Sequence, residues 1–319
     1  MLNSNQALKA TAPKKKKMSV QAKKDNLILY AILSPVLIFL IIFCYIPMYG
    51  IVIAFQNYTP GNSFFAFDDS VRWVGLKHFT DFISSEYFWR LIKNTVVLNG
   101  LQLILGFLVP IIFVLILNEV KNTKYKKLVQ TTSYLPHFIS TVVVASMVMT
   151  ALSSSGMINQ MLMIFGVEPI SYNTDPKVFP WVYVITNIWQ NFGWNGILYM
   201  AAISGIDPEI YEAAKVDGAN RWMQMRYITL PSIKGTMFIL LIFAIGGLLG
   251  SNTEFILAMY NPAIYETADV VGTYVYRMGI KGGQFSQTTA IGLFMQVINF
   301  ALLYITNTVS RKLEGYSLW

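Results

Sequence analysis

The sequence predicts an all-α polytopic membrane protein that crosses the bilayer about six times. Hydrophobic residues make up 55% of its 319 residues and charged residues only 13%, whereas soluble domains carry about 25% charged residues. The apolar residues gather in stretches long enough to span a membrane, and most basic residues lie between alternate stretches. These three observations place most of the chain in lipid or inside a membrane bundle.

The apolar stretches are taken as transmembrane helices because a helix needs about 20 apolar residues to cross a bilayer core about 30 Å thick. Six stretches approach or exceed that length, namely residues 27–55, 94–117, 131–152, 178–203, 235–260 and 288–309. Pro35, Pro47, Pro110 and Pro136 lie in or beside them. Neighbouring helices support the backbone at such prolines, so we expect kinks and not helix ends.

The basic residues predict the orientation, because short cytoplasmic loops are enriched in Lys and Arg. Seven lysines lie before the first stretch, four between the second and third, four basic residues between the fourth and fifth, and two after the sixth. One side of the membrane would therefore carry 17 of the 24 basic residues. Both termini are expected to be cytoplasmic.

Four parts are expected along the chain. They are a cytoplasmic lysine-rich tail (1–26), the first transmembrane helix with an outer interfacial segment (27–92), a core transmembrane domain (93–310) that includes a cytoplasmic loop at 205–233, and a cytoplasmic C-terminal tail (311–319). The lysines at 14–17 stand near a membrane segment, where they suit anionic lipid better than nucleic acid. The first apolar run is too long for a cleavable signal peptide and should remain as a helix.

The sequence gives little support for a metal site or a disulfide. Cys44 is the single cysteine, so no disulfide can form within the chain. His78 and His137 lie far apart in the sequence, and both are interpreted as interfacial or packing residues. We expect neither a bound metal nor a cofactor.

The loop at 205–233 has the pattern of a helix, a glycine turn and a second helix. Asp207 can cap a helix that begins at Pro208 and has acidic residues in its first turn. Gly218 permits a sharp break before a second helix at about 219–228, and Pro231 begins the return to the membrane. This loop is therefore expected to be a structured cytoplasmic element.

The spacing within this loop resembles the EAA signature of bacterial binding-protein-dependent importers. The residues that carry the resemblance are Glu212, Ala213, Ala214, Gly218, Leu230 and Pro231. In that family the loop docks on a cytosolic ATPase, so the resemblance implies that these six residues couple the chain to an ATPase. Short helical loops between membrane spans are common, and only the combined spacing favours this interpretation.

The resemblance extends over nearly the whole chain from about residue 27. The segments "VGLKHF" from Val74, "FWRLIKNT" from Phe88 and "EFILAMYN" from Glu254 are similar to permeases of the carbohydrate uptake family of ATP-binding-cassette importers. "YETADVVGTYVYRMGI" from Tyr265 and the final "YSLW" resemble LplB-type polysaccharide or oligosaccharide permeases. The resemblance implies the type I (MetI-like) permease fold in a bacterial cell membrane.

The resemblance also implies the partners. The chain has no G-x-x-x-x-G-K-[ST] phosphate loop, so ATP and magnesium would be bound by a separate ATPase and the chain itself would not be an enzyme. The expected assembly contains a second, related permease subunit, two copies of the cytosolic ATPase and an extracellular, lipid-anchored solute-binding protein. The implied solute is an oligosaccharide.

Amide and aromatic side chains are dense in the fourth stretch and continue into the fifth. The candidates for a solute pathway are Asn187, Trp189, Asn191, Trp194, Asn195, Asn252 and Glu254. Polar groups in a bilayer are costly unless they are paired or face water. Amides suit sugar hydroxyls and rings suit sugar C–H faces. Packing between helices explains the same residues equally well.

Two other functions compete with the importer. An ion-coupled secondary sugar transporter would show ionisable residues deep in several helices, and only Glu254 approaches that pattern. A membrane enzyme would need a catalytic motif such as H-E-x-x-H or G-x-S-x-G, and the sequence contains neither. The importer is the interpretation that accounts for the loop at 205–233.

Overall fold

The computed structural model describes residues 20–61, 71–250 and 252–318. Most of the predicted N-terminal tail therefore lies outside the described residues. Within these ranges the chain is helical, with turns and one isolated bridge between Gln56 and Trp73. The chain divides into two compact units, Met1–Val52 and Ile53–Trp319.

The first unit is one apolar helical run. It contains α1 (Val20–Leu40), the π-helical segment η1 (Ile41–Tyr45) and α2 (Ile46–Met48), and the 3₁₀ segment η2 (Tyr49–Phe55) continues past its end. The candidate membrane span covers Asn26–Phe55, and none of its most apolar window is buried within the chain. Such a surface suits lipid tails or a partner helix.

The second unit contains the remaining helices. They are α3 (Lys77–Ile83), α4 (Phe88–Asn118), α5 (Thr123–Tyr134), η3 (Leu135–Phe138), α6 (Thr141–Ala151), α7 (Met157–Ile164), α8 (Phe179–Ser204), α9 (Pro208–Val216), α10 (Arg221–Gln224), η4 (Met225–Thr229), α11 (Leu230–Ser232), α12 (Lys234–Gly246), α13 (Thr253–Met259), η5 (Pro262–Ile264), α14 (Tyr265–Ala268), α15 (Val271–Val275), η6 (Tyr276–Lys281) and α16 (Phe285–Glu314).

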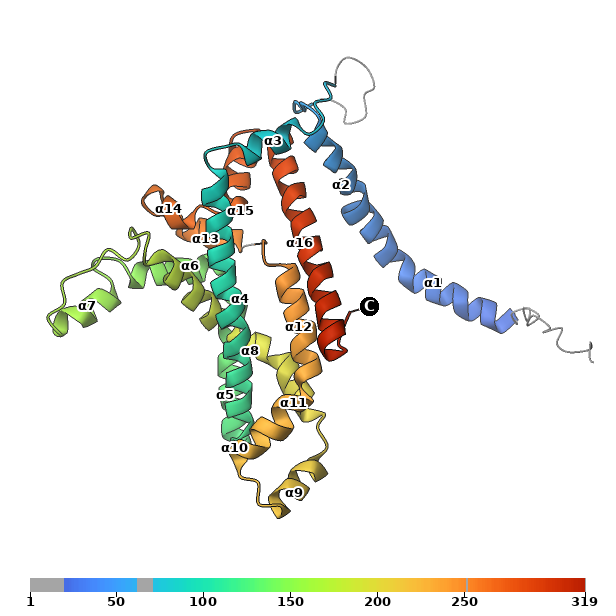
Figure 1. The fold of residues 1–319 in the computed structure, drawn as a ribbon, viewed down its shortest axis with the longest axis vertical. Helices are drawn as coiled ribbons and strands as arrows, with labels where there is room; N and C mark the ends of the chain where they lie inside the picture. The colour runs from blue at the N-terminus through green and yellow to red at the C-terminus, as the bar shows by residue number, and fades with distance from the viewer. Residues whose placement is uncertain (1–19, 62–70, 251, 319) are drawn as a thin grey trace, which may run out of the picture. The chain divides into compact units, whose positions relative to one another are not determined.

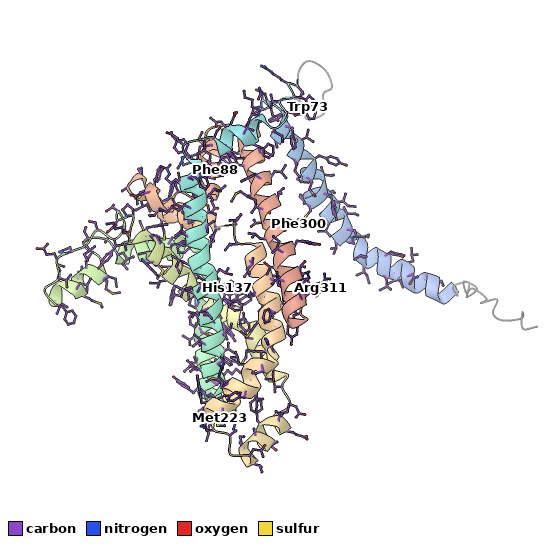
Figure 2. The ribbon with its side chains drawn as sticks, viewed as in Figure 1. Trp73, Phe88, His137, Met223, Phe300 and Arg311 are labelled. Atoms are coloured by element: carbon purple, nitrogen blue, oxygen red, sulfur yellow. The ribbon has the colours of Figure 1, made fainter. Side chains whose placement is uncertain are left out.

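The long helix α4 organises the second unit (Figure 1). It packs along α8, while α12 packs along α16. One end of α4 lies beside α15, and the other lies beside α10 (Figure 1). Figure 2 likewise places Phe88, the first residue of α4, and Met223 of α10 at opposite ends of this unit.

Helix length and composition alone identify fewer candidate spans than the six apolar stretches of the sequence. Three helical runs of the described residues qualify, at Asn26–Phe55, Phe88–Asn118 and Phe285–Lys312, and up to five if two bent pairs each form one span. The predicted helix at 178–203 exists as α8, whose 26 residues are long enough. It is not among the candidates, because its many amides make it too polar.

The third and fifth predicted stretches are each broken. The third bends by 97° between η3 and α6, where Pro136 removes a backbone donor. The fifth is two helices, α12 and α13, separated by a segment that contains Gly247 and Gly250. Glycine is a poor helix former, which accounts for the end of α12 at this point.

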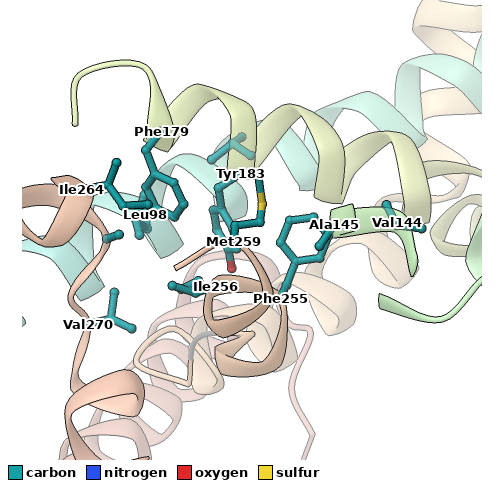
Figure 3. Packing of buried hydrophobic residues seen from close by; sticks show 12 residues of the cluster. Leu98, Val144, Ala145, Phe179, Tyr183, Phe255, Ile256, Met259, Ile264 and Val270 are labelled. Carbon is teal, nitrogen blue, oxygen red and sulfur yellow. The ribbon is translucent and has the colours of Figure 1, made fainter. Parts of the chain in front are cut away.

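Three buried apolar clusters lie along α4. Leu91 belongs to the first, together with Val271 and Tyr274. Leu98 belongs to the largest, in which Tyr183, Phe255 and Met259 pack together (Figure 3). The third contains Ile111, Val114, Tyr199, Ile203 and Ile233. These contacts fix α4 against α8, α13 and the start of α12.

The close packing of α8 against α5 generates a testable prediction. A Cβ at Gly193 would lie 2.2 Å from the carbonyl oxygen of Ser133, so Gly193→Ala should overpack the interface and cost about 2 kcal/mol of unfolding free energy. Thermal unfolding in mild detergent measures the loss.

The matched control is Gly292→Ala in α16, where an added Cβ meets nothing within 4 Å. It should unfold at or slightly above the wild-type temperature, because alanine favours helix. Equal melting temperatures for both variants would mean that α5 and α8 do not approach this closely.

Candidate functional site

A cavity of about 640 Å³ lies between α4, α8, α12 and the segment that leads to α13. Its polar or aromatic lining residues include Asn99, Gln102, Tyr183, Asn187, Trp194, Asn195, Tyr199 and Asn252. Among the described residues that line it, none is charged. The cavity can therefore accept a neutral polyhydroxylated group through amides and rings.

The structure brings four of the seven predicted pathway residues to this cavity. Asn187, Trp194, Asn195 and Asn252 line it. Asn252 also caps α13, because its side-chain oxygen accepts from the Phe255 backbone N–H at 3.2 Å. Whether these side chains contact a solute stays a prediction.

Three predicted pathway residues lie outside the cavity lining. Trp189 is exposed on α8, and Glu254 is exposed in the first turn of α13. The Asn191 amide donates to the Asn187 carbonyl at 2.9 Å, and its oxygen lies 2.9 Å from Nδ1 of His137. Asn191 therefore lies outside the cavity lining but is hydrogen-bonded to Asn187, which lines the cavity.

The histidine at the bend between α5 and α6 holds part of the cavity wall. The His137 and Trp194 rings stack with centroids 4.4 Å apart and an interplanar angle of 7°. Phe138 meets the same indole edge-on at 5.6 Å. These contacts fix the orientation of Trp194, which the sequence did not link to His137.

Two cavity residues on α4 were missed by the sequence analysis. Asn99 is only 8% exposed, yet its Nδ2 has no hydrogen-bond partner among the described residues, and neither has Oε1 of Gln102. Buried amides are normally paired, and an unpaired one costs about 1–3 kcal/mol. Both would gain a partner from water or a solute. Their i, i+3 spacing in an apolar helix was the available signal.

A buried carboxylate lies at the α15 end of α4. Asp269 is fully buried, and it pairs with Arg90 at 3.2 Å and with Arg277 at 3.0 Å. Its Oδ1 also accepts from the Tyr260 hydroxyl at 2.6 Å and from the Thr273 hydroxyl at 3.0 Å. This network links α4 to the segment between α13 and η6.

The network favours the charged form of Arg277. Burial lowers the pKa of the Arg277 guanidinium, but its hydrogen bonds to Asp269 and the charge of that carboxylate raise the pKa above its usual value. Arg277 also donates to the Tyr260 hydroxyl. Two guanidinium groups thus face one carboxylate.

The predicted coupling loop lies at the other end of α4. Asp207 caps α9 by accepting from the Glu209 N–H at 3.0 Å, and Pro208 begins the helix, as predicted. Gly218 has φ +81°, the left-handed region that favours glycine. The loop is held to the bundle by the Arg221 guanidinium, which donates to the Glu119 carbonyl at 3.2 Å.

The predicted coupling residues occupy two parts of this segment. Glu212, Ala213 and Ala214 lie in α9, which has no buried residue. Leu230 and Pro231 begin α11, the last part of one helical run, Arg221–Ser232, that also contains α10 and the π-helical η4. This run corresponds to the second helix expected at about 219–228. Nearby, Trp222 and Tyr227 are largely exposed. An exposed α9 beside exposed rings is a surface that a partner can cover.

The described part of the chain offers no group of side chains for a metal site and no cysteine pair for a disulfide. No three His, Cys, Asp or Glu side chains there are grouped to hold a metal ion. Cys44 is a free thiol on an exposed position.

The family model and the most similar relatives identify the same kind of protein. Residues 111–315 match the family model described as "Binding-protein-dependent transport system inner membrane component". The chain is 43% identical over 285 residues to the polygalacturonan/rhamnogalacturonan transport system permease protein YteP of Bacillus subtilis, covering 89% of this chain and 88% of that protein. It is 39% identical over 299 residues to protein LplB of the same organism, covering 93% of each.

Solved structures agree with the sequence comparison. The chain aligns with a TM-score of 0.84 and 42% identity to a chain of a bacterial ABC transporter involved in the import of the acidic polysaccharide alginate, covering 92% of this chain and 98% of that one. A second alignment has a TM-score of 0.85 and 41% identity, covering 93% and 99%. It is to a bacterial alginate ABC transporter in complex with an alginate pentasaccharide-bound periplasmic protein. These matches confirm the predicted permease fold.

The Asp269 network predicts the outcome of a substitution. Asp269→Asn should destabilise the protein by about 3 kcal/mol, because it leaves two guanidinium groups without their buried counter-charge. Chemical unfolding in detergent gives the value. Glu266→Gln, at an exposed position three residues earlier, should leave stability unchanged; if both variants unfold alike, the network contributes no net stability.

Proposed function

This chain belongs to the family of binding-protein-dependent transport system inner membrane components, and on that premise we propose that it is the permease subunit of an ATP-driven importer that translocates an oligosaccharide. The uncharged, amide- and ring-lined cavity carries the proposal for the solute. Sugar hydroxyls need neutral donors and acceptors, and their C–H faces pack on rings. The relatives that transport polygalacturonan/rhamnogalacturonan or import alginate support a saccharide as the solute.

Energy would come from a separate cytosolic ATPase that docks on α9. The support is the exposed surface of this helix, the spacing of Glu212, Ala213, Ala214 and Gly218, and the absence of a phosphate loop from the sequence. In this proposal Leu230 and Pro231 transmit ATPase movement to α12, which lines the cavity. No cofactor is required in the chain itself, since ATP and magnesium would bind the partner.

The complete assembly would contain a second permease, two ATPase copies and an extracellular binding protein in a bacterial cell membrane. The structural relative was solved with a sugar-bound periplasmic protein, which supports the binding protein. The poorly buried first unit and the apolar faces of the second unit offer surface for the second permease. Both chain termini would face the cytoplasm.

The ion-coupled alternative gains nothing from the structure. Glu254, the one acid proposed for it, is exposed and lies outside the cavity lining. Ion-coupled transport would need ionisable groups at the solute site.

The coupling role predicts that Gly218 acts through its backbone. An added Cβ would meet nothing within 4 Å, so only the φ of +81° opposes substitution. Gly218→Val should abolish ATP hydrolysis stimulated by the sugar-loaded binding protein, because β-branched residues avoid this region. Gly218→Asn should keep most of it, since asparagine tolerates this conformation.

Gly205→Ala is the control, because Gly205 has φ −86° and an added Cβ has only ordinary contacts. Co-purification of the ATPase is measured in parallel. Full stimulation in Gly218→Val would contradict the proposal, and so would an ATPase that never co-purifies with the wild-type chain.

If Asn99 lies on the solute pathway, its substitution should impair transport without lowering thermal stability. Asn99→Leu removes a buried amide whose Nδ2 has no partner among the described residues, so thermal stability should hold or rise. Oligosaccharide-stimulated hydrolysis should fall about tenfold if this amide binds the sugar, the loss expected for one hydrogen bond of about 1.4 kcal/mol.

Asn159 provides the opposite case, because its amide makes three hydrogen bonds to the backbone at Ser153 and Ile170. Asn159→Leu should lower the melting temperature. Normal transport by Asn99→Leu would remove Asn99 from the pathway.

A further inference from the structure

The Asp269 network holds more positive charge than it neutralises. Oδ2 of Asp269 accepts from both Arg90 and Arg277, at 3.2 and 3.0 Å. Oδ1 is occupied by Tyr260, Thr273 and a second nitrogen of Arg277. Among the described residues, no other carboxylate lies within ion-pair distance of either guanidinium. One positive charge is left over.

The surplus charge is accessible, although the carboxylate is not. The side chain of Asp269 is 0% exposed, whereas those of Arg90 and Arg277 are 38% and 29% exposed. Nε of Arg90 has no hydrogen-bond partner among the described residues, but this atom is itself buried, so only the rest of the partly exposed side chain can reach a solute. Arg90 therefore has donor capacity that its ion pair does not use.

Tyrosine rings surround both guanidinium groups. The Arg277 guanidinium carbon lies 5.0 Å from the Tyr265 ring centroid and 5.8 Å from that of Tyr274. The Arg90 carbon lies 5.2 Å from the Tyr87 centroid. Rings beside cations can hold a sugar face while the guanidinium binds an acidic substituent.

The arginine cluster, which consists of Arg90, Arg277 and their tyrosine neighbours, lies at one end of the second unit. The predicted coupling loop at 205–233 lies at the opposite end. Asn94 of α4 donates to the Asp269 carbonyl, and Glu119, just after α4, accepts from Arg221 of the loop. The 25 residues between Asn94 and Glu119 span about 37 Å at 1.5 Å per residue, more than the bilayer core of about 30 Å. If α9 meets a cytosolic ATPase, the arginines face the outside.

The same cluster is linked to the cavity by α13. This helix begins after Asn252, which lines the cavity, and ends before Tyr260, which bonds to Asp269. The eight residue steps from Asn252 to Tyr260 correspond to about 12 Å at the helical rise. The cluster and the cavity are therefore separated along the chain by a distance that a few sugar units can cover.

We propose that Arg90 and Arg277, with their tyrosine neighbours, bind the carboxylates of an acidic, uronate-containing oligosaccharide as it enters the cavity. This inference rests on the proposed function and names the solute class. A charge-assisted hydrogen bond from a partly exposed guanidinium group is the strongest contact available for such a sugar. A neutral oligosaccharide would use only the rings and the cavity amides.

Direct binding to the assembled importer in lipid nanodiscs, without the binding protein, tests the inference. The probe is fluorescently labelled trigalacturonate, and the competitor is the same trisaccharide with its carboxyl groups reduced to alcohols. Trigalacturonate should bind, and the reduced sugar should compete at least tenfold more weakly. Raised salt should weaken the acidic sugar only.

Substitutions assign the effect to Arg90. Arg90→Gln should weaken trigalacturonate binding about tenfold, as expected for losing one charged hydrogen bond, while Arg277 still pairs with Asp269. Arg90→Lys keeps the charge but loses the fork, so it should bind with intermediate affinity. Lys93→Gln removes an exposed charge one turn along α4 and should bind like the wild type.

Equal competition by the reduced sugar, unchanged binding by Arg90→Gln, or no trigalacturonate binding would each overturn the inference. In that case the arginines serve only to hold the fold. The proposed function fails separately, if no oligosaccharide-loaded binding protein stimulates ATP hydrolysis.

Discussion

The buried carboxylate of Asp269 fixes one end of α4, and the packing of the second unit depends on that helix. Asp269 draws α4 and the segment from Tyr260 to Arg277 onto a single pair of oxygen atoms. Burying this charge is tolerable only because four side chains donate to it. With that end fixed, α4 can pack along α8 and carry three apolar clusters on one continuous helix.

The length of α4 gives the second unit two functional ends. The cavity lies along the helix between them, bounded by amides of α4 and α8 and by α12. The glycine at 218 allows the turn at one end, and the arginines mark the other. A change in α9 can reach the cavity through α11 and α12, because these elements follow one another in the chain.

Local chemistry explains what the sequence could predict. The cap at Asp207 and the turn at Gly218 depend on nearby residues only, and both were predicted correctly. The positions of the helix breaks within the third and fifth stretches were not predicted, because they depend on packing between segments. Asn99 and Gln102 were missed, because their i, i+3 spacing shows that they share a helix face but not that this face meets a cavity. The Asp269 network joins residues up to 179 positions apart, beyond the reach of any local pattern.

The central claim is that α9 and the arginine cluster lie on opposite sides of a membrane. It is tested by placing one cysteine at Lys215 of α9 or at Glu266 of α14, both exposed, in a Cys44→Ser background. Intact cells are treated with a membrane-impermeant maleimide. The account predicts that the cysteine at position 266 reacts at once and that the cysteine at 215 reacts only after permeabilisation. Labelling of both from the same side would contradict it.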